Sequence, residues 1–263
     1  MQHPHIMPSL QLTVLGSGTS MGVPTLGCHC EVCGSNDPRD KRTRPSVLLS
    51  YHGHNVVIDT SPDFRAQAMR ERIDRLDAVI YTHSHADHIL GLDDIRPYNL
   101  KQGGVVPVYA SAETQKTLRR QFAYIFDDAP TESSLPGVEL HTIDGPFELF
   151  GLKFTPVVAN HGKQLVLGFR FGGAAYLTDF SSVPETSKEL LLGLDDFVLD
   201  ALRYTPHPMH STVTQSLALV AELKPQRAWF THICHDLGHI EANAKLPEGV
   251  QLAYDGLKFE VKI

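Results

Sequence analysis

Residues 78–88 read AVIYTHSHADH, and this stretch is the most informative part of the chain for both fold and chemistry. Its first five residues form a short apolar run typical of a buried strand. Directly behind them come four potential metal ligands, His83, His85, Asp87 and His88. Imidazole nitrogen and carboxylate oxygen suit zinc, manganese or iron. Because neighbours this close cannot all reach one ion with good geometry, the spacing predicts two adjacent metal ions.

Three other expected strands end in a residue of the same kind. The strands over residues 152–158, 174–178 and 227–231 lead into His161, Asp179 and His232. A single His or Asp after a strand is usually a cap or a turn residue. Four strand ends that each carry a potential ligand are hard to attribute to chance, so we expect them to meet at one site.

The pattern H-x-H-x-D-H, followed by a separated His, Asp and His, resembles the metallo-β-lactamase superfamily. The resemblance implies an α/β (α+β) fold, an αββα sandwich of two mixed sheets flanked by helices, with a dinuclear site along one edge. The implied ligands are His83, His85 and His161 for the first metal, Asp87, His88 and His232 for the second, and Asp179 as the bridge. The resemblance also gives Asp59, at the end of the run NVVID, the task of orienting the metal-binding loop.

A second candidate metal site lies in the stretch 23–45, which is poor in apolar residues. Cys28, Cys30 and Cys33 form C-x-C-x2-C, a poor disulfide framework and a plausible metal site. A closed tetrahedral zinc site needs a fourth ligand, for which Cys234 and His235 are candidates. The pattern resembles PhnP-like members of the superfamily, in which the last His of a T-H-I-x-H run completes the site. The resemblance therefore implies His235 and a zinc-clipped loop over 23–45.

Length and composition are those of a folded enzyme-sized chain. The 263 residues are 42% apolar, and 23 Lys+Arg against 30 Asp+Glu give a net charge of −7. Such an acidic balance argues against a dedicated duplex-DNA binder. The sequence has no apolar run of transmembrane length and its N-terminus lacks an apolar signal core, so we expect a cytoplasmic protein without a membrane segment.

One domain over residues 1–263 is expected, with residues 1–9 as a flexible tail. Hydrophobic periodicity predicts strands at 10–15, 46–51, 55–59, 78–82, 107–110, 138–143, 152–158, 166–171, 174–178, 197–200, 227–231, 251–254 and 258–261, and helices at 64–72, 112–122, 184–192, 213–223 and 240–244. Asp63 is expected to cap the helix at 64–72, with Arg42 and Arg44 solvated. The loop 95–105 and the segment 119–130 are expected to form walls over the metals, although Phe122, Tyr124 and Phe126 could equally form a dimer surface.

Two metal ions lower the pKa of a shared water and supply hydroxide near neutral pH. Such a site suits hydrolysis of a phosphodiester, and the PhnP-like pattern implies a small or cyclic one. A leaving alkoxide also needs a proton donor. His207 and His210, just before the helix at 213–223, are the candidates, and the resemblance favours His210. The candidate catalytic residues are thus His210, His207 and the ligand Asp87.

The alternatives are a tRNA 3′-processing endonuclease resembling RNase Z and a non-hydrolytic, binding role resembling PqqB. The absence of a long basic arm and the acidic charge weigh against RNA, and the complete ligand set weighs against PqqB. The expected cofactors are two catalytic divalent ions (zinc or manganese, or else iron) and one structural zinc. The resemblance further implies a homodimer acting on a small-molecule phosphodiester.

Overall fold

Two mixed sheets of seven strands each form the centre of the molecule. The computed structural model describes residues 9–127 and 133–263. In the first sheet the order is β14 (Lys258–Lys262), β1 (Ser9–Gly16), β2 (Ser46–Tyr51), β3 (His54–Ile58), β4 (Ala78–Ile80), β5 (Val106–Ala110), β6 (Val138–Thr142). In the second it is β13 (Val250–Leu252), β12 (Arg227–Thr231), β11 (Asp196–Asp200), β10 (Ala174–Leu177), β9 (Gln164–Phe171), β8 (Leu152–His161), β7 (Phe147–Leu149).

Each sheet has a parallel half that delivers its carboxyl ends to the same edge. Strands β3 to β6 pair in parallel in the first sheet, and β10 to β13 do so in the second. Parallel neighbours point the same way, so the residues that follow them gather at one edge. Asp59, Asp179 and His232 follow β3, β10 and β12 in this way, and Asp200 ends β11. The topology thus brings distant stretches of chain together.

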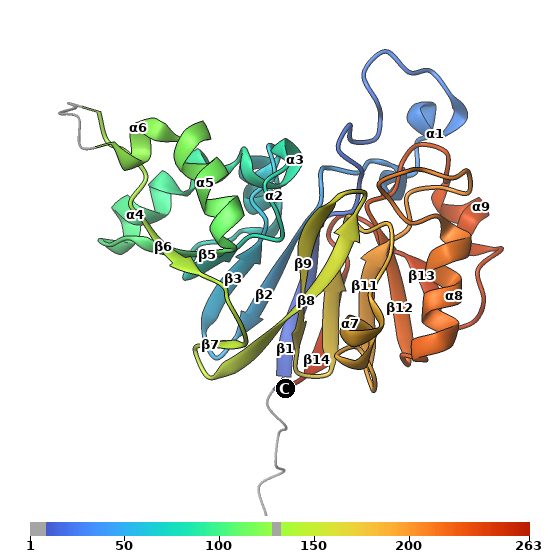
Figure 1. Ribbon diagram of the computed structural model, residues 1–263. Coiled ribbons are helices and arrows are strands. Elements are labelled where there is room, and N and C mark those ends of the chain that lie inside the picture. Colours follow the sequence, from blue (N-terminus) through green and yellow to red (C-terminus); the bar gives the residue numbers. More distant parts are fainter. Residues whose placement is uncertain (1–8, 128–132) are drawn as a thin grey trace, which may run out of the picture.

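Helices cover the outer faces of both sheets. The described helices are α1 (Glu31–Gly34), α2 (Phe64–Glu71), α3 (Ala86–Ile89), α4 (Arg96–Gln102), α5 (Ala112–Gln121), α6 (Ala123–Phe126), α7 (Glu185–Glu189), α8 (Val213–Leu223) and α9 (His239–Asn243), with 3₁₀ turns η1 (Pro38–Asp40) and η2 (Leu92–Ile95). Figure 1 shows α4, α5 and α6 on one side of the sandwich and α8 and α9 on the other. The predicted αββα sandwich is confirmed.

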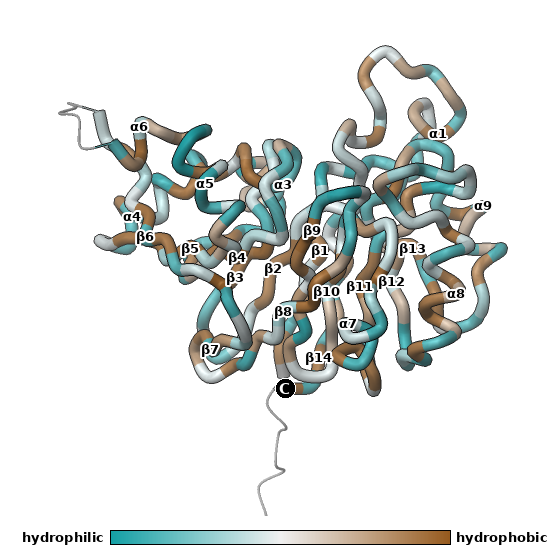
Figure 2. Tube along the Cα trace, in the orientation of Figure 1, coloured by the Kyte–Doolittle hydropathy of each residue, from teal (hydrophilic) through white to brown (hydrophobic). Residues whose placement is uncertain are grey.

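Three apolar clusters fill the layers between these elements. The central one packs the two sheets together and includes Leu12, Val56, Phe154 and Phe169. The other two lie under the helices, one against α8 and one against α2 and α5. In Figure 2 the apolar colour runs along the strands, while the connecting segments are mostly hydrophilic. Burial of strand faces on both sides explains why several strands read as continuous apolar runs.

Most predicted elements form close to the predicted bounds. The helix over 213–223 begins and ends as predicted, and a reciprocal capping box of Thr212 and Gln215 stabilises its first turn. Three predictions are wrong. The loop at 95–105 contains helix α4, the stretch 23–45 contains α1 and η1, and Phe122 of the suggested dimer surface is buried in the core. The pattern also missed β7, α3 and α6, which have only three or four residues each.

Most of the predicted tail at 1–9 lies outside the described residues, and Ser9 already begins β1. The helices in the described part of the chain are too short and too polar to cross a bilayer.

Candidate metal centre

The chain turns sharply at three of the strand ends that meet at the sheet edge. Asp59, Asp179 and His232 have φ values of 66°, 58° and 57°, in the left-handed region that side-chain-bearing residues seldom adopt. Such conformations cost about 1–3 kcal/mol each and persist where the surrounding structure imposes them. Here they turn polar side chains into the edge between the two sheets, which is the first structural sign of a functional site.

The first cluster consists of His83, His85, His161 and Asp179, whose ligand atoms all lie within 4.8 Å of one another. His85 Nδ1 lies 3.3 Å from His161 Nε2, and His83 Nε2 lies 3.9 Å from Asp179 Oδ2. The four residues come from the loop after β4, from the end of β8 and from the turn after β10. They are buried apart from His85, which is partly exposed.

The second cluster consists of Asp87, His88, His232 and, again, Asp179. Nε2 of His88 lies 3.4 Å from Asp87 Oδ2 and 3.3 Å from Asp179 Oδ1. Nε2 of His232 lies 3.6 Å and 3.4 Å from the same two oxygens. Asp179 therefore faces both clusters, with Oδ2 toward the first and Oδ1 toward the second, which is the arrangement expected of a bridging carboxylate.

These spacings fit metal coordination better than ordinary hydrogen bonding. With bonds of about 2.0–2.2 Å, neighbouring ligand atoms on a tetrahedron lie about 3.3–3.6 Å apart. The distances in the second cluster fall in this range. Moreover, four buried atoms of the two clusters make no hydrogen bond with the described residues: Nε2 of His83, Nε2 of His88, Nε2 of His232 and Oδ2 of Asp87. Buried polar atoms without partners are rare, so the residues present fit a pair of cations.

In His83, His88 and His161, a hydrogen bond at Nδ1 leaves Nε2 as the ring nitrogen that could bind a metal. His88 Nδ1 donates to Asp59 Oδ2 at 2.7 Å, and His161 Nδ1 donates to the Met209 carbonyl at 2.8 Å. The Thr82 hydroxyl donates to Asp59 Oδ2 at 2.8 Å and accepts from His83 Nδ1 at 3.0 Å. Each bond places the proton on Nδ1 and leaves Nε2 with a lone pair toward its cluster.

The electrostatics of the two clusters differ. Burial lowers the pKa of His161 to about 4, which keeps its imidazole neutral and able to bind a cation. Burial also disfavours the charged form of His232, but the carboxylates of Asp179 and Asp87 outweigh it and raise its pKa to about 9. The second cluster therefore stabilises positive charge, which a bound cation would supply in place of a proton.

A third group adjoins the centre and contains Asp200, His210 and His232. His210 Nδ1 donates to Asp200 Oδ2 at 2.9 Å, and the His210 ring stacks on His232 with centroids 4.6 Å apart. Asp200 is fully buried, and His210 keeps a small exposed fraction. The ring of His207 is 5.0 Å from that of His210, and its Nδ1 accepts from the Met209 N–H. Of the two predicted donors, His210 is the one adjacent to the clusters.

The cysteine cluster forms a separate group with His235. Nδ1 of His235 lies 3.2, 3.4 and 3.5 Å from the sulfurs of Cys28, Cys30 and Cys33. Zinc bonds of about 2.3 Å to sulfur and 2.0–2.1 Å to nitrogen place such atoms about 3.5 Å apart. Backbone N–H donation from Cys33 lowers the pKa of Cys30 to about 6, which favours the thiolate that zinc binds. Cys234 lies outside this group, and burial raises its pKa to about 11.

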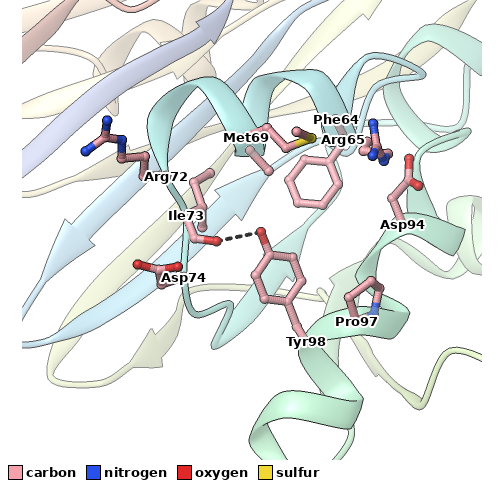
Figure 3. Close-up of a pocket in the computed structure, with 10 residues that line it drawn as sticks. Phe64, Arg65, Met69, Arg72, Ile73, Asp74, Asp94, Pro97 and Tyr98 are labelled. Atoms are coloured by element: carbon pink, nitrogen blue, oxygen red, sulfur yellow. Dashed lines mark hydrogen bonds between the residues drawn. The ribbon is translucent and has the colours of Figure 1, made fainter.

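A cavity of about 460 Å³ between α2 and α4 lies apart from these clusters. Figure 3 shows its lining, in which the Tyr98 hydroxyl donates to the Ile73 carbonyl at 2.9 Å. None of its lining residues belongs to a candidate metal group. A cavity of about 730 Å³ instead borders His83 and His85, so the space next to the first cluster is large enough for a small-molecule substrate.

A model of the family described as "Beta-lactamase superfamily domain" matches residues 54–233, well over half of the chain. The chain belongs to this superfamily. A crystal structure described as a new diphosphatase from the PhnP family is 54% identical, covers 97% of this chain and 98% of that chain, and superposes with a TM-score of 0.92. This identity confirms the predicted relationship to PhnP-like members of the superfamily.

Other proteins similar to this chain are more distant or differ from it in length. An octanoyltransferase of Porphyromonas gingivalis is 37% identical over 95% of this chain, which spans about half (51%) of that relative's length. Coenzyme PQQ synthesis protein B of a Methylobacterium species is 26% identical over 94% of this chain and 99% of the relative. The short form of human tRNase Z, 18% identical with a TM-score of 0.68 over 96% of this chain and all of that one, shares the fold.

The structure brings together the side chains of all seven residues that the resemblance implied as ligands. Their roles as ligands stay predictions. Asp200 and Thr82 were missed, because a strand-end Asp and a Thr within a strand carry no distinctive signal in sequence.

Three predictions about charged residues near the site are wrong. Asp63 does not cap α2 with its side chain but accepts hydrogen bonds from Arg44, through the backbone N–H at 2.9 Å and the guanidinium at 2.8 Å. Arg44 is thus not simply solvated. Arg42 is only 1% exposed and donates to Asp40 and to the carbonyls of Cys234 and Leu237. A buried arginine suits this position, because its guanidinium carries several N–H donors that can bind the backbone carbonyl oxygens of a loop.

Proposed function

We propose that this superfamily hydrolase is a metal-dependent phosphodiesterase that acts on a small or cyclic phosphate diester. The observation that carries the proposal is the shared carboxylate of Asp179, which faces two groups of ligand atoms at once. Two-metal sites of this kind clamp the attacking and leaving oxygens of an in-line displacement at phosphorus. The 54% identity to a PhnP-family diphosphatase supports phosphorus as the atom attacked.

In this proposal the seven superfamily positions hold two divalent ions, zinc or manganese or else iron. His83, His85 and His161 would bind the first, Asp87, His88 and His232 the second, and Asp179 both. When bound, the two ions supply Lewis acidity and a nucleophilic oxygen near neutral pH. The chain's own contribution is to fix Nε2 of the imidazoles toward the ions through Asp59, Thr82 and the Met209 carbonyl.

His210 is proposed as the general acid. Its Nδ1 must donate to Asp200, because an ionised carboxylate only accepts, so Nε2 is the atom that exchanges protons. As a hydroxide oxygen bonds to phosphorus, the bond from phosphorus to the leaving oxygen breaks, and His210 transfers its Nε2 proton to that oxygen. The neutral imidazole then regains a proton from solvent. Asp200 would stabilise the protonated imidazole before the transfer. His207 accepts a backbone hydrogen bond and is the weaker candidate.

Cys28, Cys30, Cys33 and His235 are proposed to bind one structural zinc. The four ligand atoms lie within 4.8 Å of one another, and they join the stretch 23–45 to the segment after β12. Arg42 ties the same two segments through the carbonyls of Cys234 and Leu237. The zinc would therefore strengthen a connection that hydrogen bonds already make.

Hydrolysis of a diphosphate bond is a second candidate, because the 54% identical structure is described as a diphosphatase. The chemistry at phosphorus is the same, and only the leaving group differs. Processing of tRNA ends and a PqqB-like binding role have weaker support. The likeness to tRNase Z is one of fold, and a complete set of ligand atoms is present for hydrolysis. A homodimer and a cytoplasmic location stay predictions.

The decisive experiment is a metal analysis combined with turnover of a substrate panel. The protein is loaded with zinc or manganese and assayed with linear phosphodiesters, cyclic phosphodiesters and diphosphates. We expect three bound metals per chain and turnover of at least one diester. His210→Ala should lower turnover and leave the metal content intact, whereas His207→Ala should have a much smaller effect. Full metal loading without turnover of any substrate would contradict the proposal.

A further inference from the structure

The cavity of about 730 Å³ beside the first cluster has two walls of different chemistry. We call it the α5 pocket. It extends from His83 and His85 between the polar face of α5, which carries Arg120, and the β8–β9 hairpin, which contributes Val158, Leu165 and Leu167. The Leu167 N–H donates to the Thr82 carbonyl at 3.0 Å, which fixes the hairpin against the metal-binding loop. The α5 pocket therefore opens directly beside the candidate metal centre.

The hairpin wall is apolar and accessible. Leu165 is 67% exposed and Val158 is 37% exposed, so both present aliphatic surface to the pocket. Burying them against a flat ring would remove apolar surface from water. This wall fits the face of a sugar or a nucleobase better than it fits a charged group.

The helix wall is polar and carries one cation whose charge is not neutralised. Glu113, which also lines this wall, forms an exposed ion pair with Lys116 at 3.1 Å. Arg120 is exposed and, among the described residues, has neither an ion-pair nor a hydrogen-bond partner. Its neighbour Arg119 lies over the Phe126 ring at 5.1 Å, and it does not line the pocket. A free guanidinium beside hydroxyl and amide side chains is suited to a phosphate group.

We propose that the α5 pocket binds the part of the substrate that is not attacked, and that this part is a phosphorylated nucleoside. Its ring would contact Val158 and Leu165, and its additional phosphate would contact Arg120. The inference rests on the proposed hydrolysis at the neighbouring metal centre and narrows its substrate class. Pockets of about 300–1,000 Å³ accommodate ligands of this size.

Three p-nitrophenyl esters test the two contacts separately. Methyl p-nitrophenyl phosphate has neither ring nor second phosphate, thymidine 5′-(p-nitrophenyl phosphate) adds the nucleoside, and its 3′-phosphorylated form adds the second phosphate. All three release the same leaving group, so differences in kcat/KM report binding of the remaining part. In the wild type we expect the 3′-phosphate to raise kcat/KM about tenfold, mainly through KM.

Arg120→Ala should reduce the gain from the 3′-phosphate to less than twofold, and Arg119→Ala should retain it. Leu165→Ser should reduce the gain from the nucleoside several-fold, and Leu100→Ser, an exposed residue of α4 outside the pocket, should retain it. Thermal melts of the four variants show that each one folds. A wild type that gains nothing from the 3′-phosphate, or an Arg120→Ala variant that behaves like Arg119→Ala, would overturn the inference.

The same experiment separates failure of this inference from failure of the proposed function. Turnover of all three esters with equal kcat/KM would leave phosphodiester hydrolysis standing and refute the nucleotide pocket. If no ester is hydrolysed, the panel of linear and cyclic diesters decides the proposed function, and calorimetry with thymidine 3′,5′-bisphosphate decides the pocket. Binding to the metal-loaded wild type that weakens about tenfold in Arg120→Ala supports it, and equal or absent binding refutes it.

Discussion

Asp200→Asn is expected to slow proton transfer to the leaving group without emptying the metal centre. The amide has nearly the same shape as the carboxylate and can still accept from His210 Nδ1, 2.9 Å away, but it carries no charge. A hydrogen bond to a charged group contributes about 1.5–3 kcal/mol, against about 0.5–1.5 kcal/mol for a neutral one. The difference of roughly 1–1.5 kcal/mol predicts a kcat about five- to twelvefold lower.

The leaving group provides the sharpest readout for this variant. A p-nitrophenolate leaves without needing a proton, whereas an alkoxide needs one. The loss of kcat should therefore be large for an alkyl diester and small for a p-nitrophenyl ester with the same remaining part. Metal content, measured by mass spectrometry, should equal that of the wild type. Asp200 lies 3.9 Å from His232 Nδ1, too far for a hydrogen bond, so its charge is not required to orient that imidazole.

Two outcomes would refute this reasoning about Asp200. Burial raises the pKa of Asp200, while the imidazoles of His210 and His232 act in the opposite direction. Unchanged kcat for both leaving groups would mean that the carboxyl is already neutral in the active enzyme. Equal losses for both leaving groups together with lost metal would mean that Asp200 supports the metal centre instead of the general acid.

The other predictions concern the metal ions and the fold. Asp59→Asn weakens the bond that fixes His88, so metal affinity in a chelator competition should fall about 10- to 100-fold. Cys33→Ser should remove one zinc per chain in elemental analysis and leave the two catalytic ions bound. Burial lowers the pKa of His239 to about 4, so between pH 6.5 and pH 4 this side chain is protonated in the unfolded chain and neutral in the folded one. The free energy of unfolding therefore falls as the pH drops through this range. In His239→Gln, denaturant titrations should show a smaller fall. Phe154→Ala should cost about 3–5 kcal/mol of unfolding free energy, because the ring is fully buried between the sheets.

Local signals were sufficient for most of the fold. The apolar runs before His83, Asp179 and His232 form strands as predicted, since fully buried strands leave a strong mark on the sequence. Elements of three or four residues escaped, because one turn of helix has no periodicity. Helix α3 was missed within the H-x-H-x-D-H motif for this reason; it carries Asp87 and His88, which belong to the second cluster.

The charged residues around the stretch 23–45 show where sequence reasoning failed. Arg42 and Asp63 each stand among polar residues, and the sequence there does not indicate that their side chains have partners within the protein. Their partners are Cys234 and Leu237 for the first and Arg44 for the second. The partners of Arg42 lie almost two hundred residues away along the chain, and a local sequence pattern cannot predict such a contact.

The sequence by itself determined which side chains are available for chemistry: it presents imidazoles, carboxylates and thiols at strand ends and in one loop, in a spacing characteristic of the superfamily. Tertiary structure alone decided how these groups are used. It divided the candidate ligands between two clusters, turned the two oxygens of Asp179 toward different sides, and placed Asp200 behind His210. It also left Arg120 beside an apolar wall without an ion-pair partner among the described residues. The physical reason is that coordination and proton transfer depend on distances of a few ångströms between atoms far apart in sequence, and only the packing of the two sheets sets those distances.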